Sequence, residues 1–224
     1  MDIEIPVTPE EYGRGYLALP EADGGPGVLV LHAWWGLTPF FKQVCDRLAR
    51  EGFVVLAPDL YGGQTAKSMR EADELSDRLD GDRVYTLITA AVYMLREHPL
   101  VEGDGIGVVG FSLGGAWGLL LEEGISAVVT FYGMADPQYV TAKAAYQGHF
   151  AEVDEHELAE AAKRMMDIIR VSGRSVEEYT YPGTRHWFFE ADRPQYNQQA
   201  AELAWERTIR FLKKELAGEV YGGM

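Results

Sequence analysis

Short apolar runs alternate with longer amphipathic stretches along most of this chain, beginning at Gly27. The runs at 28–32 (VLVLH) and 106–111 (IGVVGF) are apolar without a break, which is typical of strands buried on both faces. Amphipathic stretches between such runs are typical of helices that cover a sheet. The alternation therefore predicts an α/β protein with a mostly parallel central sheet and helices on both faces. Strands are expected at 28–32, 53–57, 106–111, 126–132, 147–151 and 176–181.

Local start and stop signals place helices between these strands. Thr38 and Pro39 supply a cap residue and a first-turn proline, and SMRE at 68–71 fits a capping box before an acidic helix. Residues 12–19 are expected to add an antiparallel hairpin or edge strand. Further helices are expected at 82–97, 113 to about 123, 155–171 and 196–216.

No linker rich in proline, glycine or serine, and no repeat, divides the 224 residues. The chain is therefore predicted to be a single α/β domain over 1–224, with 217–224 as a frayed tail. The acidic stretch at 70–82 is interpreted as a solvated face, and the alternative is a lid over the site.

The charge balance limits the partners of the protein. Lysine and arginine number 20 against 35 aspartate and glutamate residues, so the formal net charge is −15 at pH 7. Nucleic acids and anionic membranes require a positive surface, so neither is an expected partner. The single cysteine, Cys45, excludes an internal disulfide and a cysteine-only metal site, and no metal or other cofactor is predicted. No signal-like or membrane-spanning stretch occurs, which favours a cytoplasmic protein.

Gly110-Phe111-Ser112-Leu113-Gly114 is a G-x-S-x-G motif at the point where an apolar strand turns into a helix. In this setting the motif holds a nucleophilic serine above the edge of a sheet. The glycines allow strand and helix to pack closely, and the helix N-terminus favours developing negative charge. Ser112 is therefore the predicted nucleophile, and the alternative is a serine that only caps the helix.

A serine nucleophile needs a base and a group that orients the base. His186 follows the last predicted strand, which is the position expected of the base. The acid is expected between serine and histidine at a strand end, and both Asp154 and Asp136 satisfy this condition. Asp154 is preferred, although Asp154-x-x-Glu157 also fits a capping box for the next helix.

These three side chains suggest a reaction. Ser112 would attack a carbonyl, His186 would take and return its proton, and Asp154 would hold the imidazole. The oxyanion needs two backbone N–H donors, which Leu113 and Trp34 are predicted to supply. An apolar pocket for a small acyl or alkyl group is expected to be lined by Trp35, Trp187 and Phe188.

Six blocks occur in the order LHAWWGL (31–37), GFVVLAPDLYGG (52–63), GFSLGG (110–115), FYG (131–133), GHFAEVDE (148–155) and PGTRHWFF (182–189). Together they resemble the dienelactone hydrolase family of the α/β-hydrolase superfamily, over most of the chain. The resemblance implies the α/β-hydrolase fold and cleavage of esters. It also implies that Ser112, Asp154 and His186 form the triad and that Trp34 and Leu113 form the oxyanion hole, which favours Asp154 over Asp136.

Some positions depart from the pattern of that family. Dienelactone hydrolases proper have a cysteine nucleophile and a glutamate that controls it, where this chain has Ser112 and Ala33. They also use an arginine four residues after the catalytic histidine to clamp the substrate carboxylate, where this chain has Glu190. Glu190 is expected to repel a carboxylate, so dienelactone itself is not the expected substrate.

The sequence thus predicts a serine hydrolase that cleaves small carboxylic esters or lactones through an acyl-enzyme on Ser112. One alternative is acyl transfer to an acceptor other than water, or perhydrolysis, with the same triad. Another is a catalytically silent binding protein built on this fold.

Overall fold

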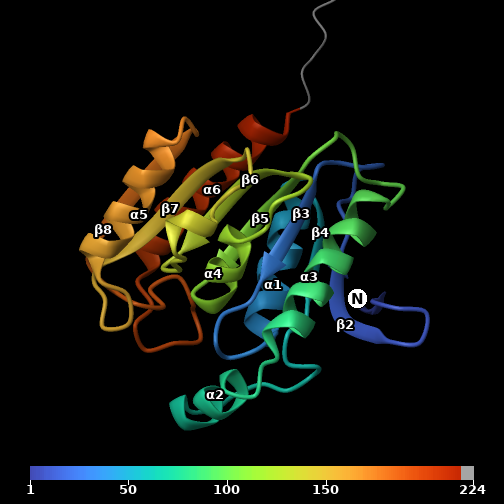
Figure 1. The fold of residues 1–224 in the computed structure, drawn as a ribbon, viewed down its shortest axis with the longest axis horizontal. Helices are drawn as coiled ribbons and strands as arrows, with labels where there is room; N and C mark the ends of the chain where they lie inside the picture. Colours follow the sequence, from blue (N-terminus) through green and yellow to red (C-terminus); the bar gives the residue numbers. More distant parts are fainter. Residues whose placement is uncertain (218–224) are drawn as a thin grey trace, which may run out of the picture.

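One eight-stranded sheet forms the centre of the computed structural model, which describes residues 1–217 (Figure 1). The strand order is β1-β2-β4-β3-β5-β6-β7-β8, and only the β1–β2 and β2–β4 pairs are antiparallel. Apart from Ala217, the predicted tail at 217–224 lies outside the described residues. The strands are β1 (Asp2–Pro6), β2 (Tyr12–Ala18), β3 (Gly27–Leu31), β4 (Val54–Pro58), β5 (Ile106–Phe111), β6 (Ile125–Phe131), β7 (Ala145–Val153) and β8 (Val176–Arg185).

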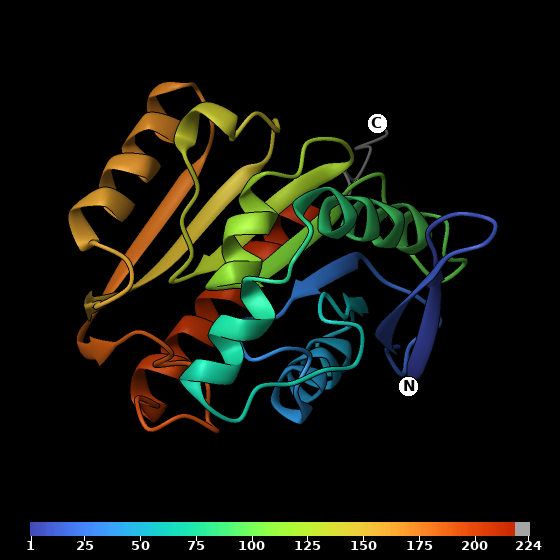
Figure 2. The same cartoon turned by 60° about the horizontal axis from the view of Figure 1, so that its bottom comes forward.

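Helices cover both faces of this sheet, as predicted. One face packs against α1 (Pro39–Arg50) and α6 (Gln198–Leu216). The other face packs against α3 (Gly81–Arg96), α4 (Leu113–Leu119) and α5 (Ala159–Val171). A short helix, α2 (Met69–Ser76), lies apart from these layers (Figures 1 and 2), and a 3-10 turn spans Pro137–Tyr139.

The two apolar layers follow from the alternation of side chains along each strand. In β3, Val28 and Val30 join the layer that includes the apolar side chains of α1 and α6. Leu29 and Leu31 join the opposite layer, with α3 and α5. Every residue of β3 is buried, which explains why its sequence is apolar without a break.

The structure differs from the sequence prediction at several places. β7 spans 145–153 instead of 147–151, and β8 runs to Arg185 instead of 181. β1 was not expected, and it pairs with β2 along the edge of the sheet. α4 ends at Leu119 instead of about residue 123, because the chain turns through Gly124 (φ +73°) to enter β6 at once. α5 begins at Ala159 instead of 155, because the preceding residues form a turn on the Asp154 carboxylate.

The acidic stretch at 70–82 forms most of α2, a turn and the start of α3. Ala72 is buried, and Leu75 packs against the apolar layer that contains Trp35. The charged side chains of α2 form exposed ion pairs, such as Arg70 with Glu74. This arrangement agrees with the interpretation of the stretch as a solvated face.

The strand order reverses direction at β3. From β3 the chain passes through α1 to β4 on one side, and later through α3 to β5 on the other side. Because α1, which follows β3, and α4, which follows β5, lie on opposite faces, the chain leaves the carboxyl ends of β3 and β5 in opposite directions. Crevices that bind ligands in open α/β sheets form at such points. Trp34 follows the end of β3, and Ser112 follows the end of β5.

We predict that Gly114→Ala destabilises the protein by about 1–3 kcal/mol, because overpacking against a rigid neighbour forces the backbone to shift. An added Cβ would lie 2.2 Å from the carbonyl oxygen of Leu31 and 2.5 Å from that of His32. Urea denaturation measures the change. Gly81→Ala is the control, since its Cβ would meet only the Trp117 ring at 3.7 Å, and it should leave stability unchanged or slightly increased. Equal stability of the two variants would contradict the packing argument.

Candidate active site

The backbone at Ser112 is strained in the way that a sharp strand-to-helix turn requires. Ser112 follows β5 directly and has φ 50° and ψ −113°, outside the regions that L-residues usually occupy. Its N–H donates to the carbonyl of Phe131 at 2.8 Å, which ties the turn to β6. Its side chain makes no hydrogen bond that caps α4, so the helix-cap alternative is not supported. Ser112 is half-buried at the carboxyl edge of the sheet.

The structure brings the three predicted triad residues into one hydrogen-bonded chain. Ser112 Oγ lies 2.9 Å from His186 Nε2. The other ring nitrogen of His186, Nδ1, lies 2.7 Å and 2.9 Å from the two carboxylate oxygens of Asp154. Because a carboxylate can only accept, Nδ1 carries the proton and Nε2 presents a lone pair to the serine hydroxyl. This is the tautomer that a general base needs.

The electrostatics keep the base neutral and the acid charged. Burial lowers the pKa of His186, and the hydrogen bond and charge of Asp154 oppose that effect without cancelling it. Burial would raise the pKa of Asp154, but the His186 hydrogen bond and charge, with N–H donors from Glu157 and His156, hold it below its usual value. Burial and the Asp154 charge raise the pKa of Glu157 to about 7.

The alternative acid, Asp136, does not reach the histidine. It caps the 3-10 turn after β6, where its carboxylate accepts from the backbone and side chain of Gln138. Asp154 accepts from the N–H groups of His156 and Glu157 and also from His186. The turn that looked like a capping box thus orients the carboxylate toward the imidazole.

The predicted oxyanion donors lie on adjoining segments. Leu113 is the first residue of α4, so its N–H lacks a partner within the helix. Trp34 lies in the loop after β3, and the α4 start packs so closely there that a Cβ on Gly114 would touch the Leu31 and His32 carbonyls. Neither N–H donates to another group in the described part of the chain.

Aromatic rings surround the histidine, and two of them were not predicted. The exposed His156 ring lies 4.9 Å from the His186 ring and 6.2 Å from the half-buried Trp34 ring. The Tyr132 ring lies 4.7 Å from the His186 ring on the interior side. Tyr132 lies within the FYG block (131–133), but no motif gives either residue a role in the sequence, because the place of each ring depends on how two loops pack.

The three predicted pocket residues divide into two groups. Trp35 and Trp187 are nearly buried, and their rings meet edge to face at 5.3 Å beside the histidine. Phe188 is fully buried against Tyr132 and Tyr181. Phe188 therefore lies in the core behind the site and does not line a pocket open to substrate.

Comparison with known proteins assigns the chain to a family. Residues 14–216 match the Dienelactone hydrolase family. The chain belongs to the dienelactone hydrolase family. "Protein usf" of Aquifex pyrophilus is 35% identical over 221 residues, covering 91% of this chain and 94% of that protein. A "Putative carboxymethylenebutenolidase" of Aquifex aeolicus is 32% identical over 217 residues, covering 91% of this chain and 94% of that protein.

A solved structure shows the same fold. A dienelactone hydrolase-like promiscuous phosphotriesterase from metagenomic libraries superposes with a TM-score of 0.83 at 23% identity, covering 96% of this chain and 98% of that chain. The predicted α/β-hydrolase fold, with a mostly parallel sheet between helices, is thereby confirmed.

Glu190 departs from the dienelactone hydrolase pattern in a different way from the one predicted. Its side chain is fully buried, and Tyr132 Oη donates to its Oε1 at 2.9 Å. The expectation that Glu190 repels a substrate carboxylate is therefore not supported, since its carboxyl faces the protein interior. Ala33, at the other departing position, is also fully buried.

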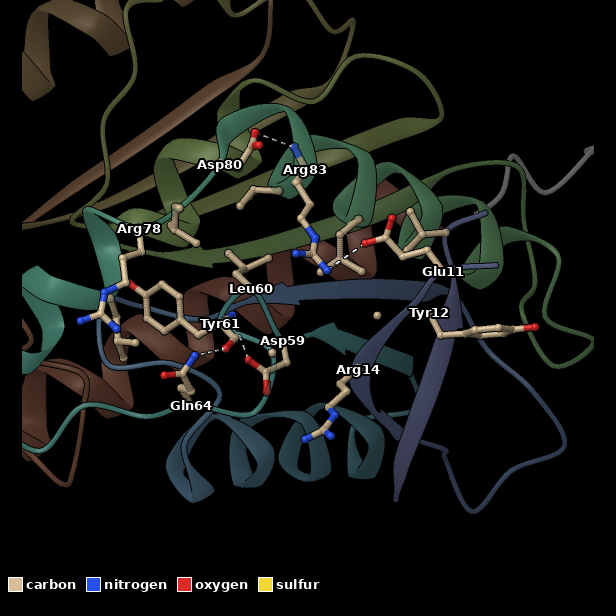
Figure 3. A pocket seen from close by; sticks show the side chains of 17 residues that line it. Glu11, Tyr12, Arg14, Asp59, Leu60, Tyr61, Gln64, Arg78, Asp80 and Arg83 are labelled. Carbon is tan, nitrogen blue, oxygen red and sulfur yellow. Dashed lines mark hydrogen bonds and ion pairs between the residues drawn. The ribbon is translucent and has the colours of Figure 1, made fainter. Parts of the chain in front are cut away.

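A separate cavity of about 430 Å³ is lined by none of the triad residues (Figure 3). Tyr61 lines this cavity, and its ring lies 5.3 Å from the His32 ring. In Figure 3, Arg83 and Glu11 point toward one another. Three arginines and three acidic residues line the cavity and balance its charge: Arg14, Arg78, Arg83, Glu11, Asp59 and Asp80.

Residues 1–217 contain no group of three or more histidine, cysteine, aspartate or glutamate side chains placed to hold a metal ion. No helix in the same range is long and apolar enough to span a membrane.

We predict that His186 titrates below pH 6.5 and that Asp154→Asn lowers its pKa further. Burial disfavours the imidazolium, whereas the Asp154 hydrogen bond and charge favour it, so removing the charge moves the pKa down. NMR titration of labelled histidine rings measures both values. His149 is the internal control, because burial lowers its pKa to about 3 in a site away from Asp154. A higher His186 pKa in the Asn variant would contradict the assigned contact.

Proposed function

We propose that this protein is a serine hydrolase that cleaves small carboxylic esters or lactones. The observation that carries the proposal is the continuous hydrogen-bonded chain from Ser112 Oγ through His186 to Asp154. It lies at the carboxyl edge of the sheet, where the strand order reverses. Membership of the dienelactone hydrolase family supports the same class of reaction.

In the first half of the reaction, Ser112 Oγ attacks the carbonyl carbon of the substrate. His186 Nε2 takes the hydroxyl proton as the bond forms, and Asp154 stabilises the imidazolium without becoming protonated. The N–H groups of Leu113 and Trp34 hold the negative charge that develops on the carbonyl oxygen. The C–O bond to the alcohol then breaks, and the imidazolium returns the proton to the leaving oxygen.

In the second half, water attacks the acyl group on Ser112, with His186 again as the base. The acid is released and the serine hydroxyl is restored. The low pKa of His186 keeps it unprotonated, and thus able to act as a base, somewhat below neutral pH.

The substrate class follows from the surroundings of the serine. The His156 ring lies beside the His186 ring, and the Trp34 ring lies 6.2 Å from the His156 ring, which suits a small apolar acyl or alkyl group. The name of one relative, carboxymethylenebutenolidase, denotes an enzyme that opens a lactone. Lactones therefore belong beside simple esters in the first substrate panel.

We predict that Ser112→Ala lowers kcat for short p-nitrophenyl esters by about 10⁴- to 10⁶-fold, because no nucleophile remains. A fluorophosphonate probe should label wild type at Ser112 and leave the variant unlabelled, as mass spectrometry of peptides would show. Circular dichroism checks that the variant is folded. Absence of both turnover and labelling in wild type would refute the assignment as a serine hydrolase.

Replacing each candidate acid separately identifies which one acts. Asp154→Asn should lower kcat by about 10²- to 10⁴-fold, since the imidazole loses the carboxylate that fixes its tautomer. Asp136→Asn is the matched control and should change kcat by less than about 3-fold, because Asp136 contacts only its own turn. A larger loss at Asp136 would reverse the choice of acid.

A further inference from the structure

Glu190 is a fully buried acid to which the proposed reaction gives no role. It lies four residues after His186, in the loop that follows β8. Tyr132 Oη donates to Oε1, whereas Oε2 has no hydrogen-bond partner in the described part of the chain. The nearest cation is Arg193, whose Nε lies 4.0 Å from Oε2 and whose guanidinium stacks on Trp35. Burial raises the pKa of Glu190 to about 8, so the acid is largely neutral at pH 7.

Tyr132 lies between the serine turn and the histidine. It has a positive φ of 40°, and its N–H donates to the His149 carbonyl at 2.8 Å. Its ring lies 4.7 Å from the His186 ring. The residues on either side of Tyr132 contact Ser112. The Phe131 carbonyl accepts from the Ser112 N–H. Gly133 packs so closely that a Cβ on it would lie 2.5 Å from the Ser112 carbonyl oxygen.

The Tyr132–Glu190 hydrogen bond therefore joins the two loops that carry the reacting groups. One end lies on the segment that supports the Ser112 turn, and the other lies on the loop that carries His186. Strain is concentrated at this junction, because the non-glycine residues with positive φ in the described chain are Ser112, Tyr132 and Trp187. Such conformations persist only where the surrounding contacts hold them.

We propose that Glu190 is a positioning residue, which holds Tyr132 against the imidazole and thereby sets the distance between Ser112 Oγ and His186 Nε2. This inference rests on the proposed function. Misplacing a catalytic group by about 1 Å can cost roughly 100-fold in rate. Loss of one hydrogen bond between the two loops can therefore lower kcat substantially. Glu190 touches neither the substrate nor the reacting atoms, and acts through Tyr132.

The titration of Glu190 affects the pH dependence of stability, which can be measured independently of activity. The titratable and charged groups that face Glu190 are Tyr132, Asp192 and Arg193. His186 and Asp154 lie on the other side of Tyr132. The unfolded chain loses the Glu190 proton near pH 4.5, whereas the folded chain keeps it until about pH 8. Unfolding therefore releases a proton in this range, and the contribution to stability falls as the pH rises from about 4.5 to 8.

The test compares Glu190→Gln, Glu190→Ala and Tyr132→Phe with wild type. Gln keeps an oxygen that accepts from Tyr132, so kcat for a p-nitrophenyl ester should stay within about 3-fold of wild type. Glu190→Ala and Tyr132→Phe should each lower kcat by roughly 10- to 100-fold with little change in KM. The double variant Tyr132→Phe/Glu190→Ala should be no worse than the poorer single variant, since both remove one contact. Asp192→Asn, an exposed acid on the same loop, is the control for loss of charge.

Two further measurements separate positioning from simple loss of stability. The decrease in Tm between pH 5 and pH 8.5 should be smaller in Glu190→Gln than in wild type, because the amide does not titrate. The His186 ring signals in NMR should shift in Tyr132→Phe and Glu190→Ala, and remain near wild type in Glu190→Gln and Asp192→Asn.

Unchanged kcat in folded Glu190→Ala and Tyr132→Phe, or additive losses in the double variant, would overturn the proposal. Failure of wild type to hydrolyse esters or react with the fluorophosphonate would instead refute the proposed function. In that case the His186 signals still decide whether Glu190 positions the ring.

Discussion

The geometry of the site depends on one strained turn, at Ser112. A positive φ at a residue with a side chain is unfavourable, and it is held here by hydrogen bonding of the serine N–H to β6 and by close packing of α4 on the end of β3. The turn allows a buried, fully paired strand to end in a half-buried serine. The same packing sets Leu113 beside the loop of Trp34, so the proposed nucleophile and the proposed oxyanion donors are positioned by the same contacts.

The sequence was sufficient for the parts of the fold that depend on local pattern. Apolar runs such as 106–111 mark strands buried on both faces, and their order along the chain implies a parallel sheet. Ser112 could be located because it directly follows such a strand. His186 could be located because it comes after the last predicted strand, 176–181, although β8 itself is a partly exposed edge strand. β1 escaped prediction because its sequence, DIEIP, has exposed acidic residues and only Ile5 is fully buried.

Other features could not be predicted because they depend on contacts between distant loops. Asp154 and Asp136 both follow strands and both accept backbone N–H groups, so the sequence could prefer Asp154, with support from the family resemblance, but the contact of Asp154 with His186 depends on the course of β7 and β8. Glu190 looks like a surface acid in an acidic chain, yet it is buried under Tyr132, 58 residues away in the sequence. An acidic residue in place of a basic one at position 190 thus leaves the charge around Ser112 unaffected, because the side chain points into the protein interior.

The hydrogen bond between Ser112 and His186 closes a segment of 74 residues. Contacts that span long segments form late, because the chain must give up entropy before they contribute. The histidine also needs β8 paired to β7, at the far edge of the parallel sheet. The site therefore comes into existence with the last strands of the sheet, and a folding intermediate that has only the β3–β5 core would hold a serine turn without its base. Recovery of activity during refolding thus requires that β8 has paired with β7.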